Sequence, residues 1–129
     1  MRILVDTNIL VSGLVAKGAC FEILEDLVYT HTPLYTSHII KECEGVLLNK
    51  LQFSPPTVNV LLAVIKNHYH KGLSATKAVN VCRDPEDNQV LADAQLNKVD
   101  FILTGDKDLL SLGTFEGIPI ISPGEYWKI

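Results

Sequence analysis

The sequence has no acidic residue from Gly45 to Arg83, although the whole chain carries 15 acidic and 11 basic side chains. The same stretch holds five of the basic residues, namely Lys50, Lys66, Lys71, Lys77 and Arg83. The formal net charge of −4 excludes a protein that coats nucleic acid through its overall charge. This segregation of charge instead predicts one acidic site with a basic surface beside it.

Other absences exclude further classes of protein. The three cysteines, Cys20, Cys43 and Cys82, are odd in number and lack metal-binding spacing, so we expect reduced thiols. No apolar run approaches the roughly 18 residues of a membrane span. The N-terminus has the pattern of a strand rather than of a signal peptide, and no glycine-rich phosphate loop is present. We therefore expect a cytoplasmic protein that does not enter a membrane.

Apolar runs and helical patterns alternate along the 129 residues, which predicts one α/β domain spanning 1–129. We expect helices at 19–30, at 37–50 with Ser37 as the N-cap, from Pro55 to about Gly72, and from Pro85 to about Lys98. Segment 13–18 reads as a loop, 73–82 as a loop or short strand, and 123–127 as a short helical turn. The predicted strands are 2–5, 34–36, 100–104 and 118–122. This order predicts a parallel sheet covered by helices on both faces.

Two acids follow buried strands, and two others lie on the inner faces of helices. Asp6 comes directly after strand 2–5, and Asp106 follows strand 100–104. Asp87 shares a helix face with Val90, Leu91 and Ala94, while Glu42 falls on the apolar face that contains Ile39 and Val46. Charged groups rarely lie on a core-facing surface without a compensating partner.

Strand ends and inner helix faces meet at the carboxyl edge of an open α/β sheet, where such folds bind ligands. Four carboxylates would repel one another there unless a cation compensated them. Mg²⁺ or Mn²⁺, which prefer oxygen ligands, would supply that charge and support displacement at phosphorus.

Each acid also has a purely structural interpretation. Asp6 and Asp84 are suitable helix caps, and for Asp84 the cap is the favoured role. Asp87 lies where it would interact with a helix dipole, and Glu42 would be partly exposed at a helix end. His68 and His70 diverge on a helix, so we expect no zinc site there.

The segments "ILVDTNILVSGL", "SHIIKECEGVL", "CRDPEDNQVLADAQ" and "DFILTGDKDLL" together resemble the PIN-domain ribonucleases. The resemblance covers nearly the whole chain and is closest to toxins of prokaryotic toxin–antitoxin pairs related to VapC. It implies a three-layer α/β/α sandwich with a four- or five-stranded parallel sheet, and Mg²⁺- or Mn²⁺-dependent hydrolysis of RNA. It also implies an antitoxin protein as partner and, in many relatives, a homodimer.

Carried over residue by residue, the resemblance assigns metal binding and catalysis to Asp6, Glu42, Asp87 and Asp106. Asn8 and Thr104 match polar positions that orient these acids, and Asp84 matches an additional acid of the "DPxD" subgroup. We further expect that RNA phosphates contact the basic residues of the acid-free stretch, Lys66, Lys71, Lys77 and Arg83. A solvated or partner-binding face is an equal alternative for these four.

Three other functions compete with a ribonuclease. A haloacid-dehalogenase-type phosphatase would need a second acid at position 8, where this chain has Asn8. A receiver domain would need paired acids after the first strand, and none are present. A non-catalytic PIN scaffold that binds RNA or protein is disfavoured because all four acids are present.

Overall fold

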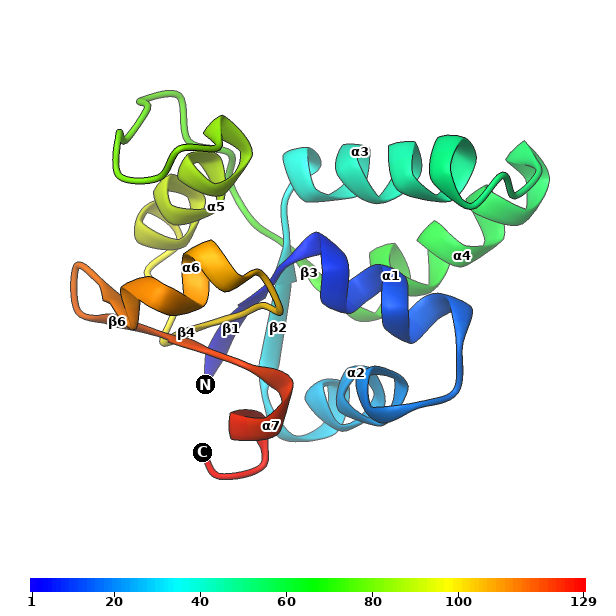
Figure 1. Ribbon diagram of the computed structural model, residues 1–129. Coiled ribbons are helices and arrows are strands. Elements are labelled where there is room, and N and C mark those ends of the chain that lie inside the picture. The colour runs from blue at the N-terminus through cyan, green and yellow to red at the C-terminus, as the bar shows by residue number, and fades with distance from the viewer.

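The computed structural model describes residues 1–129 and shows a central sheet between two layers of helices (Figure 1). The sheet has the strand order β3-β2-β1-β4-β6-β5. Five strands are parallel, and only β5 runs antiparallel, against β6 at one edge. The strands are β1 (Arg2–Val5), β2 (Thr32–Tyr35), β3 (His70–Lys71), β4 (Phe101–Leu103), β5 (Thr114–Phe115) and β6 (Ile118–Ile121). The expected parallel α/β/α fold is confirmed, with the antiparallel β5 as an addition.

The strand order reverses between β1 and β4, which lie side by side at the centre of the sheet. Strands β1, β2 and β3 proceed toward one edge, and β4 and β6 proceed toward the other. Right-handed crossovers therefore place the helices before β3 on one face and the later helices α5 and α6 on the opposite face (Figure 1). Asp6 and Asp106 follow these two central strands, at the position where open α/β sheets form their binding crevice.

Seven α-helices surround the sheet, and none alone is long and apolar enough to cross a membrane. Only α1 and α2 taken together have that length and composition, and they are bent by 106° relative to each other. Helix α3 continues into a π-helical turn, η1. The bounds are α1 (Thr7–Val15), α2 (Ala19–Thr30), α3 (Ser37–Gly45), η1 (Val46–Lys50), α4 (Pro55–His68), α5 (Pro85–Leu96), α6 (Lys107–Leu112) and α7 (Pro123–Tyr126).

Several predicted boundaries were wrong. Gly13 lies inside α1 rather than in a loop. A glycine is needed there because α2 approaches closely, and a Cβ would collide with the side chain of Leu24. Helix α4 ends at His68, since the next residues pair with β2 as strand β3. The N-cap of α3 is Thr36 instead of Ser37, and its hydroxyl accepts the amide proton of Ile39.

Segment 73–82 forms neither helix nor strand and is fastened to α5 by side chains of that helix. The Oδ1 atom of Asp93 accepts the backbone proton of Ala75 at 2.7 Å. Asn97 accepts the amide proton of Leu73 and donates to its carbonyl oxygen, each at 2.8 Å. The loop therefore covers a second, polar face of α5, in addition to the apolar face that packs on the core. These hydrogen bonds fix the loop relative to the helix.

Candidate active site

Asp6 is buried where β1 ends, and both of its carboxylate oxygens are held by hydrogen bonds. Oδ1 accepts the backbone proton of Thr7 at 2.8 Å and so caps α1. Oδ2 accepts the hydroxyl proton of Thr104 at 2.7 Å. Asp6 is only 7 % exposed, and this burial raises the pKa of its carboxyl despite the two hydrogen bonds. Asp6 is therefore the N-cap of α1, as one interpretation predicted, and it also lines a cleft.

Asp106 begins α6 in a similar way. Its Oδ1 accepts the amide protons of Asp108 at 2.8 Å and Leu109 at 3.1 Å. The turn that carries it is attached to the first turn of α1, because Asn8 Oδ1 accepts the amide proton of Gly105 at 3.1 Å. The carboxylates of Asp87, Asp106 and Asp108 have oxygens that all lie within 4.8 Å of one another.

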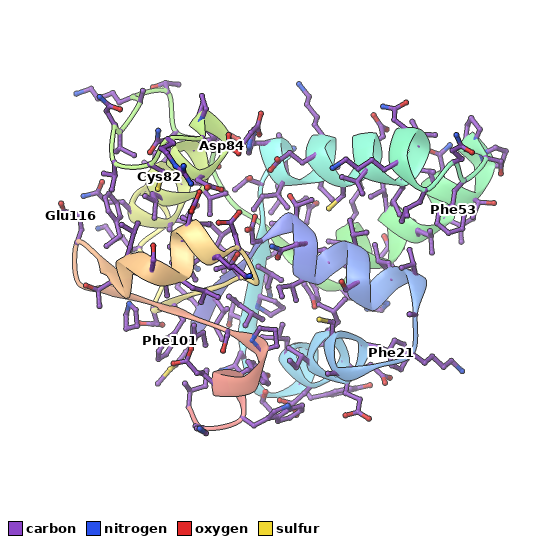
Figure 2. The ribbon with its side chains drawn as sticks, in the orientation of Figure 1. Phe21, Phe53, Cys82, Asp84, Phe101 and Glu116 are labelled. Carbon is purple, nitrogen blue, oxygen red and sulfur yellow. The ribbon has the colours of Figure 1, made fainter.

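Asp87 lies in the first turn of α5 and is 6 % exposed. Burial, together with the charges of Asp106, Asp84 and Asp6, raises the pKa of Asp87 to about 6. Asp84 precedes it as the N-cap of α5, and its Oδ1 accepts the amide proton of Glu86 at 2.9 Å. Figure 2 shows Asp84 at the start of α5, on the side that faces α3. Asp84 is thus the helix cap that the sequence predicted, and Asp87 is directed inward as its helical spacing predicted.

Glu42 extends from α3 and is partly buried. Its Oε1 accepts the hydroxyl proton of Thr7 at 3.1 Å and lies 3.3 Å from Nε2 of His38. The same His38 nitrogen is 2.7 Å from Oε2 of Glu86 on α5. Burial first, and then the neighbouring Glu86, raise the pKa of Glu42 to about 7. His38, Glu42 and Glu86 form a second cluster of side chains that could hold a metal ion, beside the aspartates.

All four predicted acids line one open cleft of about 420 Å³. Asn8 and Asp84 also line it, while Thr104 lies fully buried and contacts Asp6 and Asp106. The acids reach the cleft from the ends of β1 and β4 and from helices α3 and α5. Oxygen donors in this number suit a hard divalent cation such as Mg²⁺ or Mn²⁺. Such an ion would compensate the buried negative charge, since burial first, and then neighbouring carboxylates, raise the pKa of Asp6, Glu42 and Asp87.

The sequence matches the PIN domain family over residues 2–108. The chain belongs to the PIN domain family. This PIN domain is also similar to the uncharacterized protein MJ1680 of Methanocaldococcus jannaschii, with 31% identity over 117 residues that cover 87% of this chain and 75% of the relative. The family match replaces the dehalogenase and receiver interpretations and confirms the predicted resemblance.

Two solved structures have the same fold. A chain of VapBC2 from Rickettsia felis, bound to a DNA fragment from their promoter, superposes with a TM-score of 0.70 at 14% identity, covering 95% of this chain and 98% of that one. VapC20 of Mycobacterium tuberculosis, described as a sarcin-ricin loop cleaving toxin, gives a TM-score of 0.64 at 14% identity and covers 91% and 99%. At these identities the likeness concerns the fold of the PIN domain.

The four basic residues that we expected to hold phosphates do not line the cleft of the PIN domain. Lys66, Lys71 and Lys77 are exposed on α4, β3 and the following loop. Arg83 is engaged by an acid near the cleft, since its guanidinium donates to both carboxylate oxygens of Asp108 at 3.1 and 3.2 Å. Lys50, from the same acid-free stretch, is the only lysine or arginine in the cleft wall.

Sequence reasoning missed His38, Glu86 and Thr7 at the site of the PIN domain. His38 and Glu42 are four residues apart on a helix, so they share a face, and this spacing was available in the sequence. Glu86 gave no comparable signal, because an acid in the first turn of a helix is common for electrostatic reasons.

Proposed function

We propose that this PIN domain is a metal-dependent ribonuclease that hydrolyses RNA phosphodiester bonds with Mg²⁺ or Mn²⁺. The observation that carries the proposal is the meeting of Asp6, Glu42, Asp87 and Asp106 in one cleft at the reversal of strand order. Proteins of the same fold support it, since VapC20 is described as a toxin that cleaves the sarcin-ricin loop.

The four acids would act as metal ligands, and their neighbours would hold them in place. Thr104 fixes one oxygen of Asp6, and Thr7 fixes one oxygen of Glu42, so that the carboxylates enter the cleft already oriented. A bound divalent ion would supply an activated water and compensate the negative charge that develops at phosphorus. Lys50, the only lysine or arginine of the cleft wall, would contact a phosphate of the RNA.

The test is an RNA cleavage assay with the purified protein. We expect RNA to be cut with Mg²⁺ or Mn²⁺, to stay intact in EDTA, and to be cut again when the metal is restored. Sequencing of RNA ends after brief expression in cells, against an Asp6→Asn control, would identify the target. Binding of RNA without metal-dependent cleavage would replace the proposal with the non-catalytic scaffold.

We propose further that the protein is the toxin of a prokaryotic toxin–antitoxin pair. The support is its likeness to VapBC2, which is a complex, and an apolar groove of about 330 Å³ between α1, α2 and α4. Tyr29 and Val64 line this groove and are 87 % and 47 % exposed. A helix of the antitoxin with one apolar face would cover them.

The partner test uses a small protein encoded beside the gene of this chain, where the genome has one. We expect expression of this chain alone to arrest growth, co-expression of the small protein to relieve the arrest, and the two proteins to elute together. Val64→Glu should prevent both the relief and the joint elution, whereas Val60→Glu should not, since Val60 is an exposed valine of the same helix outside the groove. A homodimer that Val64→Glu converts to a monomer would instead assign the groove to a second copy.

A further inference from the structure

An imidazole that the family resemblance did not assign contacts two glutamates of the cleft wall. His38 lies in the first turn of α3, one helical turn before Glu42. Because residues i and i+4 share a helix face, both side chains point toward the start of α5, where Glu86 meets them. Three possible ligand atoms therefore converge from two helices, namely one imidazole nitrogen and two carboxylate oxygens.

The distances in this cluster match a metal-binding set. His38 Nε2 is 2.7 Å from Glu86 Oε2 and 3.3 Å from Glu42 Oε1, and all three ligand atoms lie within 4.8 Å of one another. Metal–ligand bonds of about 2.0–2.2 Å place neighbouring ligands of one ion about 3 Å apart. Only small side-chain shifts would be needed to admit an ion.

His38 Nε2 has a second property that points to a ligand. The atom is buried, and it faces one carboxylate oxygen of each glutamate. A nitrogen in this position needs either its own proton, which makes it an ion-pair partner, or a metal ion in place of that proton. The hydroxyl of Thr7 also donates to Oε1 of Glu42 and so orients this carboxylate. Carboxylates that bind metals are commonly held by such hydrogen bonds.

We propose that His38, Glu42 and Glu86 form a mixed nitrogen–oxygen site for a transition-metal ion, of which Mn²⁺, Co²⁺ and Zn²⁺ are the probes. The site extends the metal centre of the proposed ribonuclease, with which it shares Glu42. Imidazole favours first-row transition metals, whereas Mg²⁺ favours sites made of oxygen alone. The cluster thus makes the protein select Mn²⁺ over Mg²⁺ at this side of the cleft.

The experiment titrates the metal-free protein with Co²⁺ and Mg²⁺ at mildly alkaline pH, where an ordinary imidazole is neutral. His38→Gln and Glu86→Gln should each weaken Co²⁺ binding by about tenfold or more, since loss of a residue that merely orients a ligand already costs about 10–100-fold. Mg²⁺ affinity of His38→Gln should change by less than about threefold. The matched controls His70→Gln and Glu44→Gln, both exposed and outside the cleft, should bind Co²⁺ as the wild type does.

A second measurement observes the histidine itself. Zn²⁺ is added to the wild-type protein, and the ring nitrogens of its four histidines are observed by NMR. Coordination should shift the Nε2 signal of His38, and Asp106→Asn, which removes an acid outside this cluster, should keep the shift. An unmoved His38 signal would overturn the proposal, as would full Co²⁺ affinity in His38→Gln; the histidine would then be only the ion-pair partner of the two glutamates.

Neither measurement uses RNA, so the two proposals can fail separately. A shifted His38 signal in a protein that never cuts RNA supports this metal site and contradicts the ribonuclease. Mg²⁺-dependent cleavage with an unmoved His38 signal contradicts this site and supports the ribonuclease.

Discussion

Thr104 donates its hydroxyl proton to Asp6 at 2.7 Å, joining two residues that are 98 positions apart in the chain. The same hydroxyl oxygen accepts the backbone proton of Asp106 at 3.0 Å. Thr104 is fully buried, so water cannot replace either bond. One side chain thereby fixes the positions of two acids that follow neighbouring strands.

Replacing Thr104 by valine removes both hydrogen bonds while keeping the shape of the side chain. Because Asp6 then loses its orientation, we expect metal-dependent RNA cleavage to fall by about 10–100-fold. Thr104→Ser keeps the hydroxyl and should retain most of the activity. Equal losses in the two variants would show that packing, rather than the hydroxyl, matters at this position.

The four acids of the cleft should each be needed for cleavage. We expect Asp6→Asn, Glu42→Gln, Asp87→Asn and Asp106→Asn to reduce the rate by about 100-fold or more, since lost ligation removes transition-state stabilisation. Asp84→Asn should cost less, because an asparagine also caps a helix. Glu116→Gln is the matched control, as this residue lies in the turn between β5 and β6, away from the cleft (Figure 2). Full activity in two of the four variants would contradict the assignment.

Metal-free protein should lose stability as the pH rises from about 4 to about 7. Burial raises the pKa of Asp6 above the ordinary value of 3.8 for an aspartate. The pKa of Asp87 is raised from the same value to about 6, and that of Glu42 from 4.5 to about 7. A raised pKa means that the folded state holds the proton more tightly, so this stabilisation is complete below the unfolded pKa. It disappears as the pH passes through the folded pKa.

The measurement for this pH effect is a set of melting curves of metal-stripped protein. Asp87→Asn should show a smaller decline of the Tm than the wild type and should melt several degrees higher near pH 7. A wild-type Tm that rises over the same range would show that the acids do not destabilise one another.

Mn²⁺ should raise the Tm of the wild type, because an ion that binds only the folded state stabilises it. It should raise the Tm of Asp6→Asn much less. In EDTA, by contrast, Asp6→Asn should be the more stable of the two proteins, since it carries one fewer buried carboxyl. Four melting curves test both statements. Equal shifts by Mn²⁺ would leave Asp6 as a helix cap alone.

The basic residues outside the cleft should influence RNA binding through charge. Replacing Lys66, Lys71, Lys77 and Arg83 together by glutamine should weaken RNA binding and flatten its dependence on salt. Lys50→Gln, which changes the only cation of the cleft wall, serves as comparison and should reduce cleavage as well as binding. An unchanged salt slope in the fourfold variant would assign these four residues to a solvated or partner-binding face.

Local patterns predicted the elements that position the aspartates. Strand β1 was predicted at its observed bounds, and strand β4 and the capped start of helix α5 were predicted within a residue or two. The reason is that an uninterrupted apolar run and an Asp-Pro cap depend little on distant contacts. The inward direction of Asp87 followed from its helical spacing and agrees with its burial.

Features that depend on tertiary contacts were missed. Gly13 looks like a loop residue until α2 lies against it. Asp93 is buried completely because the loop beyond β3 donates to it, and no spacing within α5 predicts that partner. His38 reaches Glu86 only when α3 and α5 are brought together, so the sequence indicated its neighbour Glu42 by their spacing but gave no indication of Glu86.

The central place of β1 also sets an order of events during synthesis. This strand pairs with β2 and with β4, and the residues of β4 are synthesised after every residue that lines the groove of α1, α2 and α4. The acidic cleft cannot exist before Asp106 has been added, whereas the last residue of the groove is Tyr69. The residues that an antitoxin would contact in this groove are therefore synthesised before the nuclease centre is complete.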